Sequence, residues 1–266
     1  MSKLGFIGSG NMGFAMLKGA SQRFGSENLT YTDVSTERLE YIKEQLGIDF
    51  IRSNKEIMNQ CNYVVLSVKP QYYQSVLNDI KANTTKEHIM ISIAPGITID
   101  DVKMELGSDV KVVRAMPNTP ALVNEGMSGI CFSEDNFSEE ETKFVCDFFD
   151  SFGKYEIVEE RLMNAIVCAS GSSPAYVYML IEALADGAVK YGVPRDKAYR
   201  LVAQTVLGSA KMVLETNEHP GKLKDQVCSP GGTTIAAVAA LEEYGFRNSL
   251  IKATDKCYEK CTSVKR

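Results

Sequence analysis

The sequence feature that most constrains the fold is a glycine-rich segment close to the N-terminus, Gly8-Ser9-Gly10-Asn11-Met12-Gly13. It directly follows a short apolar run, residues 3–7, and leads into residues 12–23, whose apolar side chains recur at helical spacing. A strand, a tight glycine turn and a helix in this order predict the first half of a βαβ unit. A chain that begins in this way is expected to build a parallel sheet covered by helices.

Each glycine of this loop has its own expected role. Gly8 permits the tight turn, Gly10 lets the backbone approach a diphosphate, and Gly13 allows helix and strand to pack closely. A diphosphate is then stabilised at the helix N-terminus by free N–H groups and by the helix dipole. We therefore predict a Rossmann loop for NAD(P), with cofactor contacts at Gly8, Ser9, Gly10, Asn11, Met12 and Gly13.

The alternation of strand-like and helix-like segments continues through the first half of the chain. Further strand-like runs occupy residues 29–32, 63–68, 88–93, 110–113 and 155–158. Runs that are apolar throughout, rather than at every second residue, are typical of a parallel sheet buried on both faces. The predicted fold class is α/β, with an N-terminal Rossmann dinucleotide-binding domain over residues 1–158.

The remaining residues, 159–266, predict an all-α domain. The expected helices cover residues 161–191, 196–216, 234–244 and 246–261. Within the first, residues 175–189 are apolar on nearly every face, with Glu182 and Asp186 as the only charges. Because few other helices are available to cover this one, we expect a partner subunit and a dimerisation domain. The alternative is a central helix wrapped entirely by its own domain.

Two signals bear on the choice of cofactor, and they conflict. Asp33 ends the second strand, twenty residues beyond Gly13, where a carboxylate can bond the ribose hydroxyls of NAD. Ser35, Thr36 and Arg38 follow at once and offer the donors that the 2′-phosphate of NADP requires. The alternative is that Ser35 caps a helix over residues 35–46 and that the charges are solvated.

Composition excludes several classes of function. The chain is 44% hydrophobic and 24% charged, which excludes a disordered protein. The net charge is −5, and the longest Lys/Arg block is a pair at the C-terminus, so nucleic acid is not an expected partner. No segment has the roughly 20 continuous apolar residues of a membrane span, so no membrane association is expected.

Cysteine and histidine usage indicates a thiol-reduced, cytoplasmic protein without a metal site. Seven cysteines are spread along the chain without a close Cys-x-x-Cys pair, and the sequence opens on Met1 without a leader, as in cytosolic proteins. His88 and His219 stand alone, and Cys257 with Cys261 forms only one pair at i,i+4 spacing. Zinc takes three or four protein ligands, so we predict no metal.

Four further motifs follow the glycine loop in order. They are Ser67-Val68-Lys69-Pro70-Gln71, Ser92-Ile93-Ala94-Pro95-Gly96-Ile97, Val113-Arg114-Ala115-Met116-Pro117-Asn118-Thr119-Pro120-Ala121 and Ser229-Pro230-Gly231-Gly232-Thr233-Thr234-Ile235-Ala236. Together they closely resemble the pyrroline-5-carboxylate reductase family, over residues 3–261, and the third and fourth motifs are specific to it. The resemblance implies a Rossmann domain followed by a helical domain that interleaves with that of a second subunit, often in rings of dimers.

The resemblance also implies an activity. The reaction is the reduction of 1-pyrroline-5-carboxylate, a small molecule, to L-proline, the last step of proline biosynthesis. The hydride comes from NAD(P)H, with NADPH favoured and NADH as an alternative.

Carried over motif by motif, the resemblance assigns further contacts. Those on the adenosine and ribose side of the cofactor are Asn54, Val68, Lys69 and Pro70, and those near the nicotinamide are Ala94, Met116 and Asn118. The substrate contacts are Gly231, Gly232, Thr233 and Gln226, the last at a position that is often Asn in the family. Thr234 matches the threonine that hydrogen-bonds the ring nitrogen, and is the expected catalytic residue.

Residue chemistry supports the substrate turn independently. A Ser-Pro-Gly-Gly turn that leads into a helix exposes successive backbone N–H groups to a small carboxylate, and its glycines permit a close approach. The alternative for this segment is an ordinary helix start. For Lys69, at the end of a strand, the alternative is a solvated charge.

Two rival functions are open at this point. A β-hydroxyacid dehydrogenase has the same two-domain plan, but it resembles proteins with a catalytic lysine on the interdomain helix. No lysine occurs between Lys154 and Lys190, which counts against this rival. A non-catalytic NAD(P)-binding regulatory dimer requires only the glycine loop and the apolar helix, and would bind NADPH without oxidising it.

Overall fold

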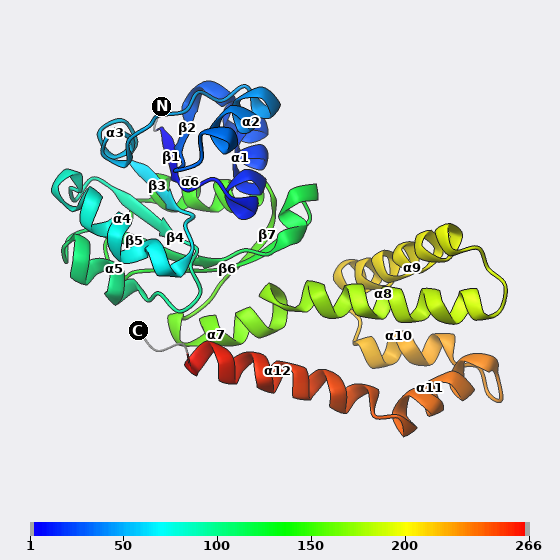
Figure 1. Cartoon of the computed structure of the whole chain (residues 1–266). Coiled ribbons are helices and arrows are strands. Elements are labelled where there is room, and N and C mark those ends of the chain that lie inside the picture. Colours follow the sequence, from blue (N-terminus) through cyan, green and yellow to red (C-terminus); the bar gives the residue numbers. More distant parts are fainter. Residues whose placement is uncertain (1–2, 264–266) are drawn as a thin grey trace. The chain divides into compact units, whose positions relative to one another are not determined.

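The computed structural model describes residues 3–263, which divide into two compact units. Unit 1 extends to Ser172 and includes the chain again from Cys257, and unit 2 is Ser173–Lys256. Figure 1 labels the elements in chain order. Every strand of the described chain belongs to unit 1, whereas unit 2 contains only helices and loops.

Unit 1 is built on a seven-stranded sheet with the order β2-β1-β3-β4-β5-β6-β7. The strands are β1 (Leu4–Ile7), β2 (Leu29–Thr32), β3 (Tyr63–Leu66), β4 (Ile89–Ser92), β5 (Lys111–Met116), β6 (Gly126–Phe132) and β7 (Gly153–Ile157). Neighbouring strands are parallel except for β5 and β6. Because β2 lies on one side of β1 and β3 on the other, the strand order reverses at β1. Open α/β sheets bind ligands at the carboxyl ends of strands at such a point.

Helices cover both faces of this sheet. One face carries α1 (Asn11–Phe24), α2 (Thr36–Leu46) and α6 (Glu139–Asp150), and the other carries α3 (Asn54–Gln60), α4 (Tyr73–Ile80), α5 (Ile99–Leu106) and α7 (Met163–Ile166). Successive residues of a strand point to opposite faces, so Phe6 lies in one core and Ile7 in the other. This double burial explains why the strands are apolar throughout, and it confirms the predicted α/β class.

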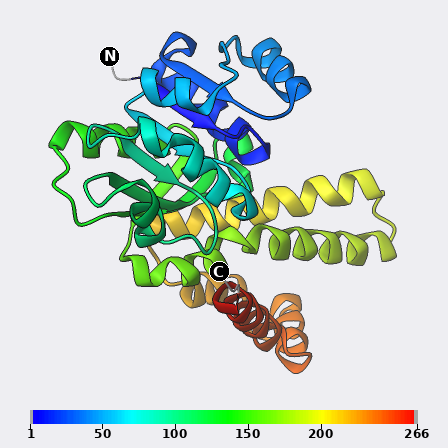
Figure 2. The ribbon, with the colours of Figure 1, turned by 60° about the vertical axis from the view of Figure 1, so that its left-hand side comes forward.

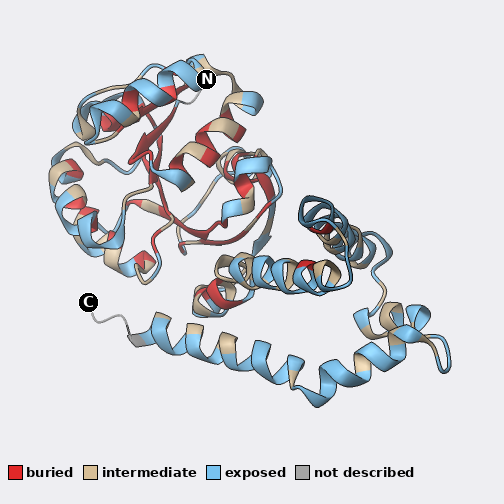
Figure 3. Ribbon diagram, turned by 45° about the vertical axis from the view of Figure 1, so that its right-hand side comes forward, coloured by how far each residue is buried: buried red, intermediate tan, exposed pale blue. Residues whose placement is uncertain are grey.

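The helices of unit 2 contain few buried residues. They are α8 (Ser173–Lys190), α9 (Arg195–Thr216), α10 (Pro220–Val227), α11 (Thr233–Glu243) and the first part of α12 (Phe246–Ser263). Helices α8 and α9 lie side by side (Figures 1 and 2), yet Tyr178, Met179 and Leu184 of α8 are exposed, and Figure 3 shows the same for most of unit 2. The alternative of a helix wrapped entirely by its own domain is therefore wrong. No helix within residues 3–263 combines the length and apolar character needed to cross a membrane.

The helix expected over residues 161–191 is interrupted. A 3-10 turn (Glu160–Leu162), α7 and a π-helical turn (Val167–Gly171) precede α8. Met163 and Val167 are buried in the core between these turns and the sheet, so this stretch belongs to unit 1 although it is helical. The compact units consequently divide at Ser172, later than the boundary expected between residues 158 and 159.

Candidate active site

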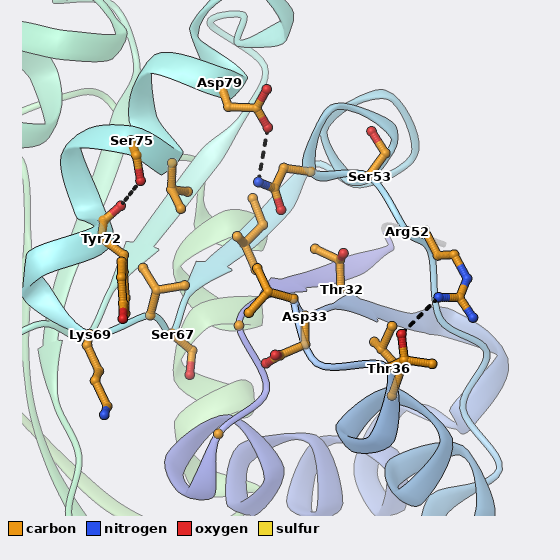
Figure 4. Close-up of a pocket in the computed structure, with 18 residues that line it drawn as sticks. Thr32, Asp33, Thr36, Arg52, Ser53, Ser67, Lys69, Tyr72, Ser75 and Asp79 are labelled. Carbon is orange, nitrogen blue, oxygen red and sulfur yellow. Dashed lines mark hydrogen bonds between the residues drawn. The ribbon is translucent and has the colours of Figure 1, made fainter.

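A cavity of about 910 Å³ opens at the carboxyl ends of β1, β2 and β3 (Figure 4). Its lining includes six of the residues expected to contact the cofactor, namely Gly8, Gly10, Asp33, Asn54, Val68 and Lys69. It also includes Thr32, Arg52, Ser53, Ser67, Tyr72, Ser75 and Asp79, which were not among the expected site residues. The cavity therefore lies where the reversal of strand order places a ligand.

The glycine loop has the geometry that its pattern predicts. Gly8 has φ +90°, and a β-carbon there would lie 2.7 Å from the carbonyl oxygen of Ser67. A β-carbon on Gly13 would lie 2.8 Å from the carbonyl oxygen of Gly8, which confirms that Gly8 serves the turn and Gly13 the close packing. Nothing lies within 4 Å of a β-carbon built on Gly10, so the space above this residue is open.

The N-terminus of α1 can accept an anion in that open space. Gly10 is the N-cap and provides no side-chain acceptor, and the first turn contains no acidic residue. The first N–H groups of a helix have no partner within the helix, and they attract phosphate. Asn11 and Met12 begin α1 here, so the expected loop residues occupy the expected place.

A serine hydroxyl that sequence reasoning missed points to the same ligand. Ser67 directly follows β3 and lines the cavity (Figure 4). Its Oγ atom is buried and has no hydrogen-bond partner among the described residues. A buried hydroxyl without a partner is costly, and a bound polar group would satisfy it. A serine after an apolar run carries no sequence signal for this role.

Asp33 lines the cavity but is also bonded to the glycine loop. Its Oδ2 atom accepts hydrogen bonds from the backbone N–H (2.7 Å) and the hydroxyl (3.0 Å) of Ser9, which is fully buried. Its Oδ1 atom accepts a hydrogen bond from the N–H of Ser35 at 3.0 Å. The carboxylate thus holds the loop against the end of β2, whichever cofactor binds.

Ser35 and Arg38 also serve the local structure. The hydroxyl of Ser35 accepts a hydrogen bond from the N–H of Arg38, which makes Ser35 the N-cap of α2. The Arg38 side chain donates from Nε to the carbonyl of Ser9 (2.7 Å) and from Nη2 to that of Gly10 (3.2 Å). Neither residue is part of the cavity lining. The helix-cap alternative for Ser35 is confirmed. Arg38 stabilises the glycine loop by bonding its backbone carbonyls.

The opposite side of the cavity is formed by α3 and by the segment after β3. Asn54 begins α3, and its Nδ2 atom donates to Oδ2 of Asp79 at 3.0 Å. Lys69 precedes a 3-10 turn (Pro70–Tyr72) in which Pro70 occupies the first position. A proline fits this position because the first N–H group of a helix has no partner within the helix. Lys69 itself is exposed and lines the cavity.

The residues expected at the nicotinamide lie outside this cavity. Ala94 follows β4, Met116 ends β5, and both are buried. Asn118 is buried as well, where its Nδ2 donates to the carbonyl of Ser170 (3.0 Å) and its Oδ1 accepts from the N–H of Met127 (2.9 Å). The structure therefore shows Asn118 fixing the turn after β5, and leaves its contact with a cofactor as a prediction.

The expected substrate residues all lie in unit 2. Gly231 has φ +70°, Gly232 is the N-cap of α11 without a side-chain cap, and Thr233 and Thr234 are the first helical residues. A β-carbon on Gly232 would lie too close to the hydroxyl of Ser229, which would have to rotate away, and 3.1 Å from the Ser229 carbonyl oxygen. Gln226 is exposed on α10. The first N–H groups of α11 are therefore presented without a competing cap.

The two histidine side chains bond backbone groups. The Nε2 atom of the buried His88 lies 2.7 Å from the carbonyl oxygen of Met58, and Nδ1 of His219 accepts from the N–H of Gly221 at the start of α10. Within residues 3–263, no three His, Cys, Asp or Glu side chains are grouped so that they could hold a metal ion.

Two family models match the chain. Residues 160–264 match the model described as pyrroline-5-carboxylate reductase dimerisation, and residues 3–96 match the model described as NADP oxidoreductase coenzyme F420-dependent. The first match covers most of the helical half of the chain, and the second covers the glycine loop and the strands that surround the cavity.

The chain is also similar to relatives of known name along its length. It is 46% identical to the pyrroline-5-carboxylate reductase of Escherichia coli over 99% of this chain and 98% of the relative. The enzyme of Pisum sativum is 42% identical over 94% of this chain and 91% of the relative. The crystal structure of a Plasmodium falciparum pyrroline carboxylate reductase with NADP bound has a TM-score of 0.88 and 36% identity, covering 98% of this chain and 97% of that one. With this similarity from end to end, the chain belongs to the pyrroline-5-carboxylate reductase family.

Proposed function

We propose that this protein reduces 1-pyrroline-5-carboxylate to L-proline, the last step of proline biosynthesis, with NADPH as hydride donor and NADH as an alternative. The observation that carries the proposal is the 46% identity to a named reductase over 99% of the chain. The lack of a lysine between Lys154 and Lys190 supports the same choice against a β-hydroxyacid dehydrogenase.

The cavity of unit 1 fits the cofactor. Open space above Gly10, the free N–H groups of α1 and the unpartnered hydroxyl of Ser67 together suit a diphosphate. When bound, NADPH supplies the hydride. Val68, Lys69, Pro70 and Asn54 then bind its adenosine and ribose side, and Ala94, Met116 and Asn118 orient its nicotinamide.

The turn before α11 suits the substrate. The N–H of Gly232 already donates to the carbonyl of Ser229 at 3.0 Å. The carboxylate therefore accepts hydrogen bonds from the N–H groups of Gly231, Thr233 and Thr234, where the helix start and the glycines permit a close approach. A protonated imine accepts hydride far better than a neutral one. The hydroxyl of Thr234 accepts a hydrogen bond from the ring N–H and thereby keeps that proton in place.

Orientation dominates the rate in this scheme. Holding the reacting carbons together contributes ~7 kcal/mol or more, whereas a single hydroxyl contact contributes ~1 kcal/mol. Residues that fix the two ligands are therefore more important than any one polar group.

We also propose an assembly and a compartment. The dimerisation model over residues 160–264 and the exposed apolar side chains of unit 2 support an interleaved homodimer, which in turn can form a ring of dimers. No disulfide joins any of the seven cysteines, which all lie within residues 3–263, and this supports a reducing compartment such as the cytoplasm.

A steady-state assay tests the function directly. We expect turnover of 1-pyrroline-5-carboxylate with NADPH and, less efficiently, with NADH. Comparable turnover of an open-chain ketoacid or hydroxyacid would contradict the proposal, and binding of NADPH without its oxidation would favour a regulatory protein.

Thr234 offers a test of the site. We expect Thr234→Ala to lower kcat about fivefold to tenfold, because one hydroxyl contact is lost. Thr234→Ser keeps the hydroxyl and should retain most of the activity, and both variants should bind NADPH normally in a fluorescence titration. Unchanged kcat in Thr234→Ala would remove this residue from the catalytic step.

A further inference from the structure

Two polar side chains meet at the rim of the cofactor cavity near the end of β2. The Nη1 atom of Arg52 donates to the hydroxyl of Thr36 at 3.4 Å, and both residues line the cavity. Figure 4 shows the pair on the side of Asp33, away from Lys69. In Rossmann folds the end of the second strand faces the adenosine ribose, so this pair lies where the 2′ position of the ribose is recognised.

The backbone fixes the position of Arg52. Phe50 forms a bridge with Tyr31 of β2, and the N–H of Ile51 donates to the carbonyl of Tyr31 at 2.9 Å. The Arg52 guanidinium lies over the Phe50 ring, 5.2 Å from its centroid. The segment after α2 is thus tied to β2, and it places the guanidinium at the end of that strand.

The guanidinium of Arg52 is also available to a ligand. Its ion pair with Glu40 is long, at 3.8 Å, and both side chains are largely exposed, so this pair contributes little. Arg38 differs, because two of its N–H groups bond the carbonyls of Ser9 and Gly10. Its guanidinium also lies over the rings of Phe14 and Tyr41.

We propose that Arg52, together with Thr36, binds the 2′-phosphate of NADPH, and that Arg38 is a positioning residue for the glycine loop. The inference rests on the proposed use of NADPH. A planar guanidinium can bond two phosphate oxygens at once. The nearby carboxylate of Asp33 is stabilised by three donors from Ser9 and Ser35. This carboxylate repels a phosphate, and the positive charge of Arg52 offsets that repulsion.

The test uses two unreactive probes on the full-length protein. Adenosine 2′,5′-bisphosphate carries the 2′-phosphate and 5′-AMP lacks it, and isothermal titration calorimetry measures the affinity of each. We expect Arg52→Gln to weaken the bisphosphate about tenfold or more and to change 5′-AMP less than about twofold. Arg52→Lys should recover part of the loss, and Thr36→Val should show a smaller loss with the same selectivity.

Two further variants serve as controls. Lys43 also lies near the Phe50 ring and pairs with Asp49, but it does not line the cavity, so Lys43→Gln removes one nearby charge without changing the cavity lining. It should leave the ratio of the two affinities unchanged. Arg38→Gln should weaken both probes to a similar degree, because it loosens the loop that holds the shared 5′-phosphate.

Each outcome decides one question. Equal weakening of both probes in Arg52→Gln, no weakening, or a selective loss in Arg38→Gln instead would overturn the inference. The proposed function is judged separately, by turnover of 1-pyrroline-5-carboxylate in the unmodified protein. If that turnover occurs and the KM ratio of NADPH to NADH is unaltered in Arg52→Gln, the function stands and the inference fails. If turnover is absent while Arg52 still discriminates the probes, the reverse holds.

Discussion

The two units bury their helices to very different degrees. In unit 1, the 14-residue α1 has six buried residues, Gly13, Ala15, Met16, Leu17, Gly19 and Ala20. In unit 2, the 18-residue α8 has one buried residue, Ala185, and the 22-residue α9 has one, Ala198. Large apolar side chains of unit 2 are exposed, among them Tyr178, Met179, Leu184, Leu201, Leu207 and Leu214. Unit 1 thus completes its core within one chain, whereas unit 2 has apolar surface to share with a partner.

The largest expected effect is that of a charge on the exposed apolar face of α8. Met179 and Met104 are equally exposed, at 68% each, on α8 of unit 2 and α5 of unit 1. We expect Met179→Glu to abolish the dimer and the activity, because an unpaired charge in an apolar interface costs several kcal/mol. Met104→Glu is the matched control and should change neither. Sedimentation combined with the reductase assay measures both, and a stable, active Met179→Glu dimer would contradict the comparison.

The core of unit 1 should be costly to disturb and independent of assembly. Phe148 is fully buried, with ring centroids 6.0 Å from Phe6, 5.0 Å from Phe149 and 5.2 Å from Phe152. We expect Phe148→Ala to lower the free energy of unfolding of unit 1 by about 3–5 kcal/mol. Denaturant unfolding at two protein concentrations should give the same loss at both. A loss that grows on dilution would mean that the unit 1 core also depends on the partner.

Two glycines of unit 1 differ in whether they serve the fold or only cofactor binding. Gly8 has φ +90° and would clash with the backbone of Ser67, so Gly8→Ala should cost about 1–3 kcal/mol of stability. Gly10 faces open space, so Gly10→Ala should change stability by less than about 0.5 kcal/mol. Both should weaken NADPH binding in a fluorescence titration. A Gly10→Ala protein with normal affinity would place the diphosphate elsewhere.

The smallest expected effect is a pH dependence that arises in unit 1. Burial raises the pKa of the Cys61 thiol from 9.0 to about 11 and the pKa of the Tyr73 hydroxyl from 10.0 to about 12. The folded state favours the protonated forms, so their contribution to stability is complete below about pH 9 and is lost as the pH rises through about 12. Denaturant titrations from neutral to alkaline pH measure this slope. Cys61→Ala should make the slope shallower, and an unchanged slope would exclude the Cys61 contribution.

Local patterns predicted the framework of unit 1 because the interactions there are short in range. The glycine loop, β2 at Leu29–Thr32 and the Ser35 cap of α2 follow from backbone geometry and from residues a few positions apart. No comparable local pattern indicated β6, which begins with Gly126 and also contains Gly129. Glycine is depleted in strands. Gly129 is nevertheless needed here, because a β-carbon would lie 2.7 Å from the side chain of Ile166, which is distant in the sequence.

The fold class, the dinucleotide loop and the motifs that carry the family resemblance could be predicted from the sequence, because these depend on periodicity and on the spacing of a few residues. Which donors face the cofactor cavity depends on the tertiary structure. Arg38 looked like the better phosphate ligand because it follows Asp33 closely, yet its side chain is bonded to the carbonyls of Ser9 and Gly10. Arg52 is farther along the chain, and it reaches the cavity because backbone pairing with β2 places it there. Sequence distance sets which residues are neighbours along a helix, but the pairing of separate segments sets which side chains meet in a site.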